Sequence, residues 1–139
     1  MVFAHFFLAL IWFKAAPALF TRFELSLVAA LLLAAISAGS GLAAQMTSIK
    51  RVSTWAQQQI NTTGRIVGIP MGPLALPYGI CFAVSLLLAW LTLMGFDQRF
   101  WRNITYWAET PIFAAIAFSL PLALHWVISS VLMGRAARG

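Results

Sequence analysis

Charged residues and cysteine are both scarce in this sequence. Charged residues make up 9% of the 139 residues and hydrophobic residues 62%, whereas about a quarter of a soluble domain is charged. A chain of this length buries only about two thirds of its unfolded surface, so a single aqueous core cannot hide this much apolar surface. The composition predicts an integral membrane protein, and the mean hydropathy of +0.89 agrees.

The same scarcity excludes several kinds of chemistry. The single cysteine, Cys81, permits neither an intrachain disulfide nor a thiolate metal site. Glu24, Asp97 and Glu109 are the only acidic residues, and they are too scattered for a carboxylate metal site or a paired-carboxylate mechanism. The sequence contains no phosphate-binding loop and no nucleophile–base pair. We therefore expect a protein that is not an enzyme and that has no metal or resident cofactor.

The formal net charge of +6 does not point to nucleic acid. The basic residues occur singly or in pairs at the edges of apolar runs, where they meet anionic lipid headgroups. We expect membrane lipids as partners, together with other integral membrane subunits or further copies of this chain, and no nucleic acid.

Three stretches are long and apolar enough to cross a bilayer. A spanning helix needs about 20 mostly apolar residues, and residues 25–44, 76–96 and 112–133 meet this requirement without a formal charge. The sequence therefore predicts an all-α fold, a polytopic bundle of transmembrane helices that forms one domain over residues 1–139.

Residues 1–20 form a further apolar helix whose placement the sequence leaves open. The segment contains Lys14 and Pro17. It either lies in the membrane interface or forms a fourth span with Lys14 reaching towards the headgroups. We favour a membrane-embedded hairpin with the next span.

Residues 46–74 divide into an amphipathic helix and a segment rich in proline and glycine. Helical spacing of Ile49, Val52, Trp55 and Ile60 predicts a helix of about 13 residues that prolongs the preceding span or lies on the membrane. Residues 62–64 supply its stop signal. The following RIVGIPMGPLALP is apolar yet too rich in proline for a regular helix, so its backbone groups need a protein cover at membrane depth.

Aromatic and basic side chains beside the spans predict interfacial anchoring. Residues 97–111 combine four charges with aromatic rings, and Pro111 suits the first turn of the last helix. The predicted headgroup anchors are Lys14, Lys50, Arg51, Arg99, Trp101, Arg102, Tyr106 and Trp107. With four spans, Lys50, Arg51, Arg65, Arg135 and Arg138 share one side, which predicts a cytoplasmic C-terminus.

Small residues in the first span predict close helix packing. Ala35 and Gly39, Ser37 and Gly41, and Gly39 and Ala43 each form a pair spaced four residues apart. Such pairs let two helix backbones approach closely in a membrane. The partner helix is either another span of this chain or another subunit.

His5 and His125 are the ionisable residues that a membrane-embedded function would use first. One use is ligation of haem b by both imidazoles. Counting 1.5 Å per residue places His125 about 12 Å and His5 about 5 Å from their span ends, a mismatch of about 7 Å. We expect instead that His125 hydrogen-bonds a neighbouring helix or a carbonyl group near Pro121.

By elimination, the sequence favours a small accessory or scaffold subunit of a larger membrane complex, in a respiratory, photosynthetic, secretion, conjugation or transport assembly. The localisation that we expect is the bacterial inner membrane. An oligomeric holin-like pore or small transporter is the alternative, and a haem b-binding anchor using His125 and His5 is the second alternative.

Overall fold

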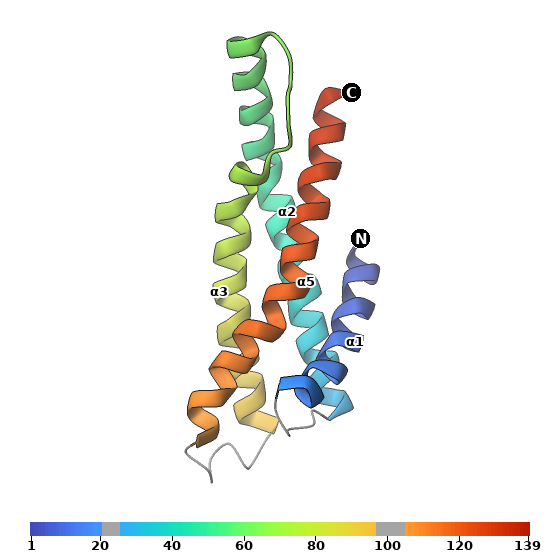
Figure 1. Ribbon diagram of the computed structural model, residues 1–139, viewed down its shortest axis with the longest axis vertical. Coiled ribbons are helices and arrows are strands. Elements are labelled where there is room, and N and C mark those ends of the chain that lie inside the picture. The colour runs from blue at the N-terminus through green and yellow to red at the C-terminus, as the bar shows by residue number, and fades with distance from the viewer. Residues whose placement is uncertain (21–25, 97–104) are drawn as a thin grey trace.

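The computed structural model describes the backbone of residues 1–20, 26–96 and 105–139. It also describes the side chains of these residues, except those of residues 16–20, 93–96, 105–114 and 116–118. It is all-helical, with 90% helix and no strand in the described ranges. Helices α1 (Val2–Phe20), α2 (Leu27–Thr63), α3 (Met71–Phe96) and α5 (Thr105–Arg138) run alternately down and up one long axis (Figure 1). The predicted all-α helical bundle is confirmed.

Three of these helices are long and apolar enough to cross a membrane: Leu27–Thr63, Met71–Thr92 and Ser119–Arg138. Each of them overlaps most of one uncharged stretch from which a span was predicted, because a continuous apolar run of this length satisfies its backbone groups within the helix. The bundle is therefore compatible with an integral membrane protein.

The shorter apolar helix, Val2–Ala15, belongs to the bundle. Figure 1 shows α1 running back along α2, and α1 also contacts α5. Ala9 and Phe13 are fully buried, and they pack against Ala30 and Leu33 of α2 and Leu122 of α5. Alanine on the facing side of α2 allows the close approach. The segment packs as a hairpin with the next helix, and its embedding in the membrane stays a prediction.

Helix α2 continues without a break from the apolar span into the amphipathic stretch. The Ser26 side chain accepts a hydrogen bond from the Ala29 N–H and caps the start. Gly64 follows the last residue with φ 73°, and its N–H binds the Ile60 carbonyl at 2.9 Å. The amphipathic helix thus prolongs the span, which was one of the two predicted arrangements.

Helix α3 begins earlier than the proline-rich sequence predicts. We expected irregular backbone through Pro77, but α3 starts at Met71 and contains both Pro73 and Pro77. Pro73 lies in the first turn, where N–H groups have no helical partner, so it is tolerated there. The irregular part ends at Pro70, which is buried, and a Cβ on Gly134 of α5 would lie 3.0 Å from the Pro70 ring. The chain's own last helix therefore covers part of this segment.

Helix α5 also begins before its predicted start, at Thr105 rather than near residue 112. Pro111 consequently falls within the helix instead of in its first turn. Figure 1 shows that α5 changes direction partway along its length, as helices with an internal proline such as Pro121 do.

Candidate functional site

Polar side chains from helices α1, α2, α3 and α5 meet at one buried position in the bundle. We call these side chains the histidine cluster: His5 of α1, Ser37 of α2, Tyr78 of α3, and His125 and Ser129 of α5. All of them are buried, and the two histidines expose only 6% (His5) and 3% (His125) of their surface.

Hydrogen bonds link the members of the histidine cluster across the helices. His5 Nε2 lies 2.8 Å from Ser37 Oγ, and His125 Nδ1 lies 2.6 Å from the Tyr78 hydroxyl. The Tyr78 hydroxyl donates to Ser129 Oγ at 3.0 Å. The imidazole rings of His5 and His125 are 5.0 Å apart between centroids and tilted by 40°. The prediction that His125 hydrogen-bonds a neighbouring helix is therefore confirmed.

Gly41 provides the space into which both imidazoles fit. A Cβ atom at this position would lie 2.8 Å from His5 Nδ1 and 3.0 Å from His125 Nδ1. Real Cβ atoms essentially never lie as close to another atom as this position would lie to His5 Nδ1. The absence of a side chain at Gly41 is thus a requirement of the histidine cluster.

Two nitrogen atoms in the cluster have no hydrogen-bond partner in the structure, namely His5 Nδ1 and His125 Nε2. Apolar clusters lie on both sides of this level: one contains Phe13 and Leu33, and the other contains Ala44 and Leu74. An unsatisfied polar group in such surroundings costs about 1–3 kcal/mol. Two buried imidazole nitrogens without a hydrogen-bond partner therefore mark this cluster as the candidate functional site.

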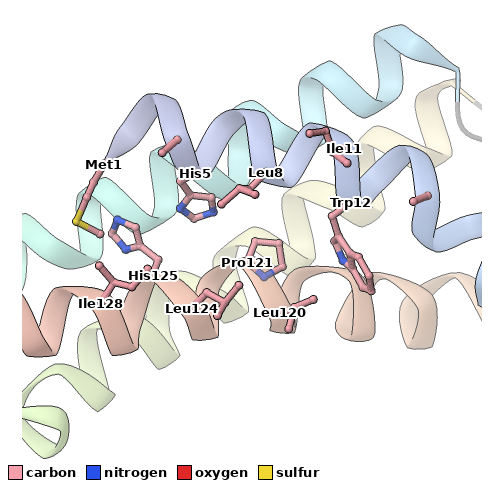
Figure 2. Close-up of a pocket in the computed structure, with 12 residues that line it drawn as sticks. Met1, His5, Leu8, Ile11, Trp12, Leu120, Pro121, Leu124, His125 and Ile128 are labelled. Carbon is pink, nitrogen blue, oxygen red and sulfur yellow. The ribbon is translucent and has the colours of Figure 1, made fainter.

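A cavity of about 300 Å³ lies between α1 and α5, and both histidines line it. Figure 2 shows their rings at one end of this α1–α5 groove, which Leu8, Leu120 and Leu124 continue along the two helices. The rest of its lining is also almost entirely apolar.

The two histidines meet because α1 starts partway along the bundle. Figure 1 places the N-terminus near the middle of α5, so the ends of α1 and α5 are not level. The sequence estimate measured the depth of each histidine from the end of its own helix and assumed that the two helix ends lie at the same depth in the membrane. That assumption placed the two imidazoles at different depths. In the structure their centroids are 5.0 Å apart.

The arrangement does not match ligation of one haem iron by both histidines. An imidazole nitrogen binds a metal at about 2 Å and its ring centre lies roughly 1 Å beyond, so rings on opposite sides of one ion have centroids about 6 Å apart. The observed separation is 5.0 Å, and His5 Nε2 is already bound by Ser37. The described residues also contain no group of three or more His, Cys, Asp or Glu that would hold a metal ion.

The small residues predicted for helix packing divide between two faces of α2. Ser37 and Gly41 are buried and face the histidine cluster. Ala35, Gly39 and Ala43 are exposed and line a shallow groove shared with Cys81, Val84 and Leu88 of α3. The hydroxyl groups of Ser85 of α3 and Ser40 are hydrogen-bonded to each other beside this groove. One set of small residues of α2 therefore packs against other helices of this chain, and the other set lies on its exposed surface.

The predicted headgroup anchors are described only in part. Lys14 is exposed on α1, and Lys50 and Arg51 are exposed on α2. Arg99, Trp101 and Arg102 lie outside the described residues, as do the side chains of Tyr106 and Trp107.

Sequence reasoning missed Tyr78 and Ser129 as members of the site. The signal that was available is a phenolic hydroxyl near the start of a span, because such a group needs a hydrogen-bond partner once it is buried. Which partner it finds depends on how α3 and α5 pack.

Comparison with protein-family models, with curated proteins and with solved structures found no match to this chain. Over the described residues, the class that the fold itself defines is a small all-helical bundle compatible with a membrane, with a buried histidine cluster that joins α1, α2, α3 and α5.

Proposed function

We propose that the protein is a non-catalytic accessory subunit of a larger complex in the bacterial inner membrane. The observation that carries this proposal is the length of α2. Its 37 residues extend about 55 Å at 1.5 Å per residue, whereas the hydrocarbon core of a bilayer is about 30 Å thick. Several turns of α2 therefore lie beyond the apolar region, where a partner can bind them.

Residues 50–63 form this protruding part, which we call the α2 arm. Its inner side rests on the bundle through Val52, which is buried, and Trp55. Its outer side carries exposed polar groups, including Gln58 and a Gln57–Asn61 hydrogen bond of 3.1 Å. A helix held on one side and polar on the other offers a rigid surface for a partner subunit.

Charge supports the orientation that we propose for the arm. The C-terminal parts of α2 and α5 lie at the same end of the bundle (Figure 1). Exposed basic residues gather on these parts and on the segment after α2: Lys50, Arg51, Arg65, Arg135 and Arg138. Cytoplasmic segments carry an excess of Lys and Arg, so this end of the bundle is proposed to face the cytoplasm.

The serines do not favour the alternative of a pore. A pore-forming bundle needs a polar helix face that remains available to water. The sequence offers two weakly polar pairs for such a face, Ser37/Ser40 and Ser129/Ser130. Ser37 and Ser129 are buried in the histidine cluster, and Ser130 donates to the Trp126 carbonyl of its own helix. Ser40 is hydrogen-bonded to Ser85. Their hydroxyl groups are engaged within the bundle.

Site-specific photo-crosslinking in the native membrane tests the proposal. A photoreactive amino acid replaces Gln58, on the α2 arm, or Leu87, which is exposed on α3 within the span. We expect the photoreactive residue at position 58 to form an adduct with a different polypeptide, whose mass exceeds the 15.2 kDa of the chain. We expect that the photoreactive residue at position 87 does not crosslink this polypeptide. An adduct only between copies of this chain would favour a homo-oligomeric pore or transporter, and no protein adduct at position 58 would overturn the proposal.

A further inference from the structure

The chain has two histidines, and the tertiary structure brings both of them into the histidine cluster. Imidazole is the one side chain whose charge ordinarily changes between pH 5 and 8. His5 and His125 are both buried, and the centroids of their rings are 5.0 Å apart. The side chains that ordinarily respond to pH in this range are therefore gathered at a single contact between α1 and α5.

No carboxylate among the described side chains balances a positive charge on these two imidazoles. On α1 the amino group of Met1 acts electrostatically on His125. On α3 the Tyr78 hydroxyl contacts His125, and Cys81 interacts with Tyr78. Helix α2 contributes a serine and a glycine, neither of which titrates. A cation here would be buried beside a second imidazole without a counter-ion among these groups, which is costly.

The hydrogen bonds of the cluster also favour neutral rings. A protonated imidazole carries a hydrogen on both of its nitrogens. One nitrogen of each ring, His5 Nδ1 and His125 Nε2, is buried and has no hydrogen-bond partner in the structure. A charged ring would therefore have a buried N–H group without an acceptor, whichever nitrogen carries the hydrogen of the neutral ring.

The part of α1 that carries His5 has fewer buried contacts than the part that follows it. Ala9 and Phe13 are fully buried in an apolar cluster with residues of α2 and α5, and these contacts do not titrate. Among residues 1–8, His5 alone is buried, and the side chain of Phe3 is 81% exposed. The packing of the first two turns of α1 therefore depends on the histidine contact.

We propose that the histidine cluster is a pH-sensitive joint, in which uptake of a proton by its imidazoles separates the first two turns of α1 from α5. A charged ring is solvated by water once these turns have moved away. Acid therefore favours the open form below about pH 6.5, where imidazole ordinarily takes up a proton. The apolar contacts of Ala9 and Phe13 keep the rest of α1 in place, so opening widens the α1–α5 groove without unfolding the bundle. This inference does not depend on the proposed subunit role.

Distances between spin labels, measured by pulsed electron paramagnetic resonance on the full chain in lipid vesicles, test the joint. In a Cys81→Ala background, one pair of labelled cysteines replaces the exposed residues Phe3 of α1 and Leu132 of α5, and a second pair replaces Leu42 of α2 and Leu87 of α3. We expect the first pair to show a second, longer distance below about pH 6.5. The ratio of the longer to the shorter population should rise about ten-fold per pH unit for each proton taken up. The second pair should keep one distance from pH 8 to pH 5. An unchanged first pair over this range would overturn the proposal, and so would equal lengthening of both pairs, because that reports unfolding of the bundle.

A variant without imidazoles assigns the response to the two histidines. The double substitution His5→Gln and His125→Gln removes both protonation sites and keeps a polar amide at each position. The first label pair should then show the same distance at pH 8 and pH 5. Ser130→Ala, whose serine binds its own helix, should keep the wild-type response. A pH response that persists in the double variant would contradict the assignment. If the double variant does not assemble at pH 8, the titration of the two label pairs in the wild-type background still decides the proposal.

Discussion

The imidazole rings of His5 and His125, which come from opposite ends of the chain, lie 5.0 Å apart in the interior of the bundle. Each ring is hydrogen-bonded to a different helix, His5 to Ser37 of α2 and His125 to Tyr78 of α3. This contact therefore joins two hydrogen-bonded pairs into one cluster that includes α1, α2, α3 and α5.

The two neighbouring glycines of α2 should respond differently to alanine. Gly41→Ala places a Cβ 2.8 Å from His5 Nδ1, and overpacking of this kind costs about 1–3 kcal/mol. Gly39→Ala meets no atom within 4 Å, and alanine is favoured over glycine in a helix by about 0.5–1 kcal/mol. Thermal unfolding in detergent should show a lower midpoint for Gly41→Ala and an unchanged or higher one for Gly39→Ala. Equal midpoints would contradict the close approach at Gly41.

The Tyr78–His125 hydrogen bond should appear as an energetic coupling. A double-mutant cycle with Tyr78→Phe and His125→Ala should give a coupling of about 0.6 kcal/mol, the average for hydrogen bonds between membrane helices, and no more than the maximum of about 1.7 kcal/mol. The free energy of unfolding in detergent is the quantity to measure. Ser130 binds the Trp126 carbonyl of its own helix, so a cycle of Ser130→Ala with Tyr78→Phe should show no coupling. A Tyr78–His125 coupling as small as this control would mean that the bond is absent.

The end of the α2 arm should depend on the glycine that terminates it. Gly64 has φ 73°, a conformation that costs other L-residues about 1–2 kcal/mol. Gly64→Ala should therefore lower the free energy of unfolding by about that amount. Gly72 is a matched control because a Cβ there meets no atom within 4 Å and its φ is not positive. Equal free energies of unfolding for Gly64→Ala and Gly72→Ala would contradict the conclusion that a left-handed glycine at position 64 terminates the α2 arm.

Labelling of thiols should separate the span from the arm. Cys81 lies in α3 within the span Met71–Thr92, where lipid disfavours the reactive thiolate. A membrane-impermeant maleimide should leave Cys81 unmodified in intact membrane vesicles and should modify Gln58→Cys from the cytoplasmic side. Modification of Cys81 in the wild-type chain would contradict the assignment of α3 as a span. Reaction of Gln58→Cys only from the opposite side would reverse the proposed orientation.

Much of the fold was predictable because it depends on local sequence. Continuous apolar runs fixed the three long helices, and Gly64 marked the end of α2. The start of α3 was less predictable: Pro73 argues against a helix interior, yet it is tolerated in a first turn. Sequence alone does not reveal that the turn begins at Met71, whose carbonyl accepts a hydrogen bond from Trp126 of α5.

The candidate site was predictable only as separate residues. His5 and His125 were recognised because an ionisable group is costly in a membrane. Their meeting was not recognised, because it depends on where α1 begins relative to α5 (Figure 1). The same holds for Ser37 and Gly41, since the small-residue pattern of α2 does not say which of its faces turns inward.

The sequence by itself determined that this chain is a helical protein suited to a membrane, because hydropathy and helix length are properties of each segment alone. The tertiary structure decided which polar side chains share one buried level: His5, Ser37, Tyr78, His125 and Ser129 come from four different helices. Apolar helices can pack in many rotations and offsets at similar cost, because lipid surrounds an apolar side chain as favourably as protein does. The choice among those packings rests on contacts between distant residues, namely the interhelical hydrogen bonds of this cluster and the close approach at Gly41.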